Sequence, residues 1–163
     1  MRVEGYKLTL FVFSVLLSCQ KKFEAPANIF ANAPSVFTAQ IDGSPFVASI
    51  YGAEIRSDSI ISIAAKSDDN KTLVFTVLDS GVHRYTLDIN AKVNVAGYID
   101  VAGIAFASNS GVNSNQSGGG LSITSIDAMR HLISGTFHFK GFRKTDMKQK
   151  NITLGTFNNI PYR

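Results

Sequence analysis

The chain has 163 residues, of which 16 are lysine or arginine and 12 are acidic, and its single cysteine excludes an internal disulfide. The net charge of +4 is too small to indicate a nucleic-acid-binding protein, which normally concentrates basic residues on one face. The length suits one domain of ordinary size with its own hydrophobic core.

The first 18 residues have the pattern of a secretory signal peptide. Arg2 and Lys7 make the start basic, and residues 8–17 form an apolar run without a charge or a helix breaker. This run has the length of a signal-peptide core, whereas a membrane-spanning helix needs about 20 residues. We therefore expect residues 1–18 to be a signal peptide.

The end of this segment indicates a lipid anchor. Leu16, Leu17, Ser18 and Cys19 together resemble the lipobox of bacterial lipoproteins. The resemblance implies that the signal peptidase recognises the first three residues, and that Cys19 carries acyl chains such as palmitate and becomes the first residue. Two or more acyl chains hold a protein stably on a membrane. The alternatives are an ordinary secretory signal followed by a free cysteine, or a short buried helix.

Residues 19–34 are expected to be a lipidated tether. The segment has neither strand nor helix periodicity and contains two prolines. Fully extended, it reaches at most about 50 Å. Ile29 and Phe30 could instead pack onto the domain, which we place at residues 35–163.

The domain opens with apolar and polar residues in alternation, as in half-buried β-strands. Phe37, Ala39 and Ile41 share one face, and Asp42-Gly43 is a tight-turn sequence before the alternation resumes at 46–50. This pattern predicts a β-hairpin.

Further strands are expected along the rest of the chain. The alternation predicts them at 61–65, 73–77, 85–89, 121–123, 133–139 and 152–157, with less regular strands within 93–107. No segment has a convincing helical period. The sequence therefore predicts an all-β domain, an antiparallel β-sandwich or flattened β-barrel of about nine or ten strands.

Two segments depart from simple alternation. In the last strand Ile152 and Leu154 lie in one phase and Phe157 in the other, which predicts a bulge at Gly155. Residues 108–120, SNSGVNSNQSGGG, are a low-complexity polar segment. We expect a mobile loop there, with its three glycines acting as a flexible linker.

Several motifs in this order resemble a family of small, uncharacterised lipoproteins that is widespread in Bacteroidota-type bacteria. They are FTAQIDGSPFVAS at 37–49, LSITSID at 121–127, ISGTFHF at 133–139 and ITLGTFNNIPY at 152–162. The family pattern is an opening F-x-A-x-I-x-G hairpin and a closing pair of Gly-Thr-Phe strands. In physical terms each glycine permits close backbone approach, and each phenylalanine fills the core.

The resemblance implies an outer-membrane location in the cell envelope, and it supplies no catalytic residues. Residues 20–24, QKKFE, lack the acidic cluster expected of a surface-export signal in such bacteria. The sequence leaves open whether the domain faces the periplasm or the cell surface.

Candidate catalytic and metal-binding residues do not form a recognisable pattern. His83, His131 and His138 have no third ligand at a zinc-site spacing. Asp68-Asp69 fits a turn that caps backbone amides. We therefore expect no enzyme, no metal and no cofactor.

The strongest charge feature is a basic segment near the C-terminus, which contains only Asp146 as a carboxylate. Its cations are Lys140, Arg143, Lys144, Lys148 and Lys150. One interpretation is an anion-binding loop for lipid headgroups, acidic glycans or an acidic protein face. The other is a solvated hairpin end, in which lysines discourage edge-to-edge aggregation.

A short segment, Asp58-Ser59-Ile60, resembles the acceptor for protein O-glycosylation in the same bacterial group. Three residues match by chance often, so the sequence does not decide whether Ser59 is glycosylated.

These observations predict a lipid-anchored cell-envelope protein that acts as a non-enzymatic binding or assembly module. Its partner would be a glycan, a lipid or an envelope protein, with no nucleic acid involved. The alternative is a lipocalin-like carrier that holds an apolar ligand inside a barrel, and a third hypothesis is an envelope hydrolase.

Overall fold

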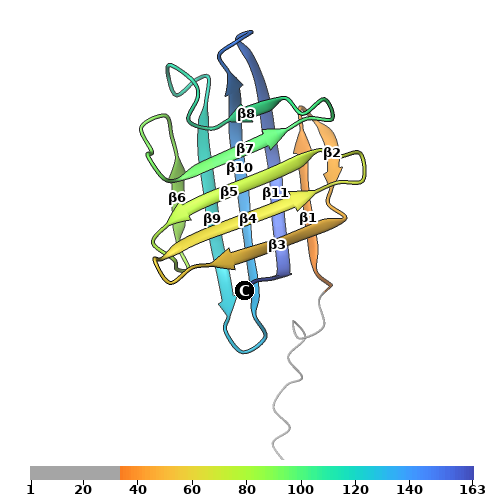
Figure 1. Cartoon of the computed structure of the whole chain (residues 1–163), viewed down its shortest axis with the longest axis vertical. Helices are drawn as coiled ribbons and strands as arrows, with labels where there is room; N and C mark the ends of the chain where they lie inside the picture. The colour runs from red at the N-terminus through yellow and green to blue at the C-terminus, as the bar shows by residue number, and fades with distance from the viewer. Residues whose placement is uncertain (1–33) are drawn as a thin grey trace, which may run out of the picture. The chain divides into compact units, whose positions relative to one another are not determined.

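The computed structural model describes residues 34–163. The expected signal peptide, the lipobox, Cys19 and the tether up to residue 33 lie outside the described residues. The described part consists of eleven β-strands without a helix (Figure 1). The strands are β1 (Val36–Ile41), β2 (Ser44–Val47), β3 (Ile50–Ile55), β4 (Ile60–Lys66), β5 (Thr72–Leu78), β6 (Arg84–Leu87), β7 (Val95–Ile99), β8 (Ala105–Ala107), β9 (Gly118–Asp127), β10 (Leu132–Arg143) and β11 (Lys148–Pro161). No helix capable of crossing a membrane occurs between residues 34 and 163.

The strands form two layers of antiparallel sheet. The back layer has the order β6-β9-β10-β11-β1-β2, and the front layer has the order β8-β7-β5-β4-β3. Figure 1 shows the front strands crossing the back strands at a steep angle. The predicted all-β, antiparallel fold is confirmed.

β10 joins the two layers at one corner. Its residues 132–140 pair with β9 in the back layer, whereas Phe142 near its end pairs with Ala107 of β8 in the front layer. At the opposite corner Tyr162 makes a parallel bridge to Ala53 of β3. The sheet therefore curls over itself and encloses one core.

Alternation of side chains determines which face of each strand enters this core. In β5 Leu73, Phe75 and Val77 are at most 1% exposed, while the residues between them face outward. Six phenylalanines at the centre are each at most 3% exposed, and each lies in an aromatic pair with another: Phe37, Phe46, Phe75, Phe137, Phe139 and Phe157. The interior between the layers is packed with these rings.

The predicted opening hairpin is present. β1 pairs with β2, and the two turn residues Asp42 and Gly43 have φ values of 50° and 81°. Positive φ at both positions is the geometry of the tight turns that match the twist of hairpin strands.

The two Gly-Thr-Phe motifs pair with each other. Gly135 lies opposite Phe157, and Phe137 lies opposite Gly155. A Cβ added to Gly135 would lie 2.5 Å from the Phe157 ring, and one added to Gly155 would lie 2.3 Å from the Phe137 ring. Each glycine therefore leaves room for the phenylalanine of the other motif. The sequence predicted close backbone approach at the glycines and core positions for the phenylalanines, but not this exchange between the two motifs.

The structure corrects the sequence prediction at β3. The segment Ile50–Ile55 is a separate strand, whereas the sequence indicated only the end of the first hairpin at Ile50. Tyr51, Ala53 and Ile55 alternate along the face that packs against the core, but each is only partly buried. Small residues at Gly52 and Ala53 and the apolar Ile50 in the opposite phase weaken the periodic signal of this short strand.

The bulge in β11 lies one residue before the predicted position. The pairing with β10 slips between Ile152 and Gly155, and the pairing with β1 slips between Thr153 and Thr156. Leu154, which lies within both intervals, has φ 49°. Leu154 is 71% exposed, so it does not share the buried face of Ile152. The extra residue of the bulge turns its side chain into solvent.

Candidate binding surface

The basic segment forms the hairpin between β10 and β11. The Arg143 guanidinium donates hydrogen bonds to both carboxylate oxygens of Asp146, with Nε 2.6 Å from Oδ1, and lies 5.8 Å from the centre of the Phe106 ring. These hydrogen bonds hold the pKa of Asp146 well below its ordinary value and raise that of Arg143. Arg143 therefore stabilises the turn and is not freely available to a ligand.

The four lysines of the segment differ in their partners. The Lys148 ammonium lies 3.4 Å from Asp146, and that of Lys150 lies 2.7 Å from Asp42. Lys140 donates to the carbonyl oxygen of Asn115 at 3.3 Å. Lys144 is exposed and has no ion pair among the described residues. Lys144 and the 70% exposed Lys148 are thus the cations most open to an anion.

The polar loop before β9 is organised by its own hydrogen bonds. The Gly111 N–H donates to the hydroxyl of Ser117 at 2.9 Å, and the Val112 N–H donates to the side-chain oxygen of Gln116 at 2.9 Å. Ser117 is 1% exposed.

The predicted glycine linker is wrong. Gly118, Gly119 and Gly120 are the first residues of β9, paired with β10 and β6. A Cβ at Gly119 would lie 2.2 Å from the carbonyl oxygen of His138, so glycine is needed for the close approach of the two strands.

The two loops meet at one end of the domain. Gln149 of β11 donates its side-chain amide to the carbonyl oxygens of Asn115 and Gln116, at 3.3 and 3.0 Å. We call residues 108–117 and 140–150 together the hairpin end. The two segments are distant in the sequence, and no local pattern indicates that Gln149 joins them.

The described chain begins at the opposite end. Val36 pairs with Asn158, and the Ser35 hydroxyl donates to the carbonyl oxygen of Asn159 at 2.6 Å. From Lys148 to Asn158, β11 extends about 30 Å.

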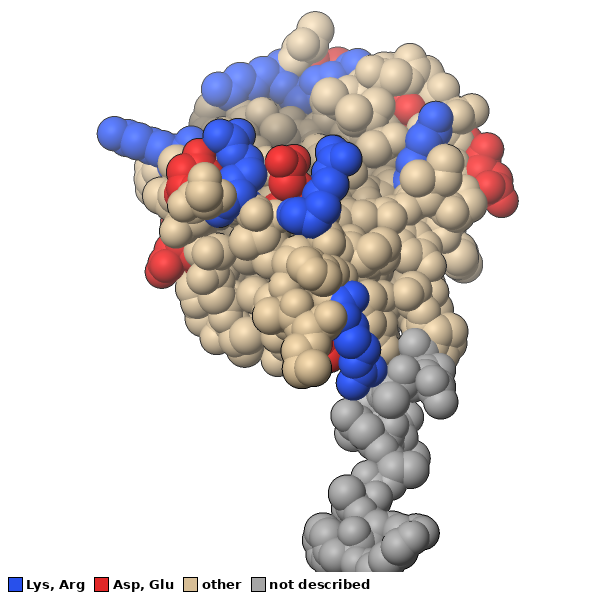
Figure 2. All heavy atoms as spheres, turned by 60° about the horizontal axis from the view of Figure 1, so that its bottom comes forward, with Lys and Arg blue, Asp and Glu red and all other residues tan. Residues whose placement is uncertain are grey.

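The view in Figure 2 brings the lower end of Figure 1 forward, and there basic side chains stand apart from one another, several of them against acidic ones.

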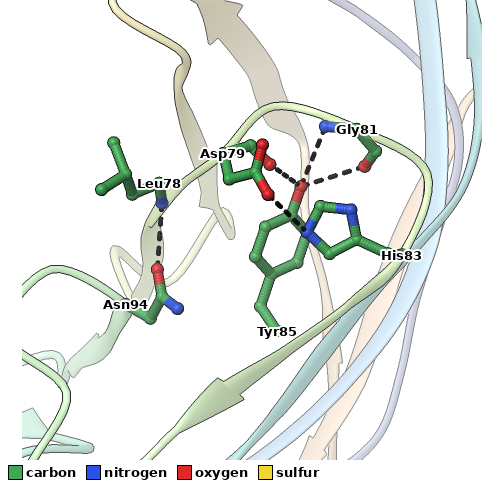
Figure 3. Close-up of polar contacts among 6 residues, drawn as sticks. All are labelled: Leu78, Asp79, Gly81, His83, Tyr85 and Asn94. Atoms are coloured by element: carbon green, nitrogen blue, oxygen red, sulfur yellow. Dashed lines mark hydrogen bonds and ion pairs between the residues drawn. The ribbon is translucent and has the colours of Figure 1, made fainter.

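The histidine nearest to a carboxylate belongs to a structural loop. The imidazole of His83 lies 3.9 Å from the carboxylate of Asp79, whose side chain is 86% exposed (Figure 3). The Tyr85 hydroxyl donates to the Asp79 carbonyl oxygen at 2.7 Å and accepts from the Gly81 N–H at 3.0 Å. Burial raises the pKa of this phenol above its ordinary value. The cluster therefore fastens the β5–β6 loop to the core.

The three histidines are not brought together. His83 packs on Tyr85, and His131 packs on Tyr162. His138 projects beside Gly120 on the back layer. Within residues 34–163, no group of three histidine, cysteine, aspartate or glutamate side chains is placed to hold a metal ion.

Asp68 and Asp69 lie in the turn between β4 and β5, as the sequence predicted. Asp69 accepts a hydrogen bond from Ser67 and pairs with Lys71 at 2.7 Å, and these contacts lower its pKa to about 2. Ser59 lies in the β3–β4 turn, where it is exposed and has φ 64°.

One feature of the surface was missed at the sequence level. A shallow, open pocket of about 790 Å³ lies on the outer face of β3, β4 and β5, beside residues 161–163. Its floor includes Gly52, Ala64 and Val74. The sequence does not indicate this pocket, because its floor residues lie on three separate strands and only the pairing of those strands aligns them.

The family model described as Domain of unknown function (DUF6252) matches residues 32–161. The chain belongs to this family. This match confirms the expectation of an uncharacterised family. It covers nearly all of the β domain that the structure describes at residues 34–163. No curated protein and no solved structure matches the chain.

Proposed function

We propose that this DUF6252 protein is a lipid-anchored, non-enzymatic binding module of the bacterial cell envelope, and that its hairpin end binds an anionic partner. The observation that carries the proposal is the joining of two polar loops, one of them basic, at the end opposite Ser35. The segment that would lead from an acylated Cys19 enters the domain at Ser35.

This arrangement favours a partner away from the membrane that holds the anchor. A domain tethered at Ser35 can present its hairpin end about 30 Å farther from the lipid surface. Lys144 and Lys148 would then meet an acidic glycan or the acidic face of an envelope protein. The lipobox pattern, together with the resemblance to outer-membrane lipoproteins, supports the location.

The packed interior favours a binding surface over a lipocalin-like carrier. A carrier needs a ligand-sized cavity between its layers. Here Phe75 lies 4.7 Å from Phe137 and 5.8 Å from Phe139, measured between ring centres. The described pocket lies outside these layers.

Heparin, a polyanion, is a suitable first probe of the hairpin end. The full chain in mild detergent, applied to heparin-agarose, should elute at lower salt when it carries Lys144→Gln and Lys148→Gln, because two lysine contacts to sulfate or carboxylate groups are lost. The matched control is Arg56→Gln with Arg163→Gln, which removes two cations near the other end and should change the elution less. If both double variants elute alike, the hairpin end is not the anion-binding surface.

A further inference from the structure

The outer face of the front layer has an unusual composition. Strand pairing aligns one residue from each of its five strands in a continuous row across the sheet: Gly52, Ala64, Val74, Gly97 and Ala107. We call this set the small-residue row. It leaves the backbone of five adjacent strands with little side-chain cover.

The charges of this face lie in the two neighbouring rows and at Arg163, which lines the pocket at the edge of β3. On one side the row contains Ile50, Lys66, Thr72, Ile99 and Ala105, and on the other side it contains Glu54, Ser62, Thr76 and Val95. Lys66 and Glu54 are both exposed, and neither makes an ion pair within residues 34–163. They are separated by about 13 Å along the strands.

The outer face of the back layer differs from this one. Its central residues are hydroxyl-bearing, with Ser122, Thr136, Thr156 and Thr38 in one row, and Arg84 stands at its edge. Thr38 and Thr156 bond to each other through their hydroxyls at 3.1 Å. Such a hydroxyl-bearing face suits contact with water, whereas the front face is mostly small and apolar.

We propose that the front face binds a second copy of this chain, with a two-fold axis running along the small-residue row. A two-fold axis in the plane of the face exchanges the two flanking rows. Lys66 of one copy then lies next to Glu54 of the other, and the reverse contact forms at the same time. Ile99 faces Val95 of the second copy, so that apolar residues also meet.

The shape of the face suits this symmetry. A twisted sheet is saddle-shaped, and a saddle is self-complementary under a two-fold axis along or across its strands. The small-residue row lies on the axis, where bulky side chains would hold two sheets apart. The pocket over β3, β4 and β5 is where the second copy would sit.

The size of the face predicts a weak dimer. Five strands spaced about 4.8 Å apart and about 17 Å long offer a flat area on the order of 400 Å². This is at the small end for specific interfaces, which bury about 800 Å² of accessible surface on each partner. We therefore expect association in the micromolar range or weaker. The proposal does not depend on binding at the hairpin end.

Charge reversal at the two ends of the face tests the symmetry directly. In sedimentation equilibrium of the full chain in density-matched detergent, the parent protein should dimerise as its concentration rises. Glu54→Lys or Lys66→Glu alone should weaken the dimer at least about ten-fold, because each variant places like charges opposite each other. Mixing the two variants should restore it, since each Lys–Glu contact is then re-formed across the interface.

Thr124→Lys, on the outer face of the back layer, is the control and should leave the association unchanged. Circular dichroism and urea unfolding of each variant show that the exposed substitutions leave the fold intact. A parent protein that remains monomeric throughout overturns the proposal. A mixture of the two charge variants that associates no better than either alone also overturns it.

Discussion

At the scale of single residues, the paired Gly-Thr-Phe motifs explain why two glycines occur inside long strands. Gly135 and Gly155 would ordinarily weaken β10 and β11, because glycine in a strand interior has no side chain to pack. Here the rings of Phe157 and Phe137 occupy the space above them. The local cost is offset by burying two phenylalanines in the core.

Replacing Gly135 by alanine should therefore destabilise the domain. The new Cβ would lie 2.3 Å from the carbonyl oxygen of Ser122, a backbone atom that cannot move aside easily. We expect a loss of about 2–3 kcal/mol in the free energy of unfolding, measured by urea denaturation. The control is Gly52→Ala, whose added Cβ has its nearest neighbour at 3.6 Å. Equal stability of the two variants would contradict this account of the motif.

At the scale of elements, the β5–β6 loop depends on one buried hydroxyl. Tyr85 is 3% exposed, and its hydroxyl contacts the backbone of Asp79 and Gly81 (Figure 3). The neighbouring bond from the Leu78 N–H to the Asn94 side chain, at 2.9 Å, fixes the end of β5. The loop that carries His83 is thus ordered from both sides.

Tyr85→Phe should loosen this loop without removing the ring from the core. The substitution leaves the Gly81 N–H without its acceptor, so we expect a loss of about 1–2 kcal/mol in unfolding free energy. Amide hydrogen exchange of residues 79–83 should become faster. Tyr98→Phe is the matched control, because the Tyr98 ring is also 3% exposed while its hydroxyl has no hydrogen bond in the described region. Unchanged exchange in Tyr85→Phe would show that the loop is held by other contacts.

At the scale of the whole molecule, the position of Ser35 determines how a tether would orient the domain. Tyr51 donates its hydroxyl to the Ser35 carbonyl oxygen at 2.7 Å, so the entry of the chain is fastened to β3 as well as to β11. A load applied through the tether would therefore be shared by both layers. This attachment leaves the hairpin end at the distal side.

The proposed anchor makes a direct prediction. Cys19→Ala should abolish incorporation of an alkyne-labelled palmitate analogue and should leave the protein unprocessed or released from membranes. Ser18→Ala, which keeps a small side chain before the expected cut, should remain labelled. Labelling of the Cys19→Ala protein would show that the lipobox interpretation is wrong.

The candidate site was predictable only in part. The run of cations from Lys140 to Lys150 is visible in the sequence, because charge is a property of each residue alone. The sequence does not show which of these cations are free to bind an anion. Arg143 pairs with Asp146, and Lys150 pairs with Asp42, which lies more than 100 residues before it in the chain. Side-chain pairing across the fold decided that only part of the run is available.

The sequence by itself determined the all-β class, the opening turn at Asp42-Gly43 and the core positions of the phenylalanines in the two Gly-Thr-Phe motifs. These features follow from the alternation of neighbouring residues and from local backbone preference, which act within a few positions of the chain. The tertiary structure alone decided that β10 serves both layers, that Gln149 joins two distant loops, and that five small residues align across the front layer. Each of these depends on which strands pair, and the energy of that pairing comes from contacts between residues far apart in sequence.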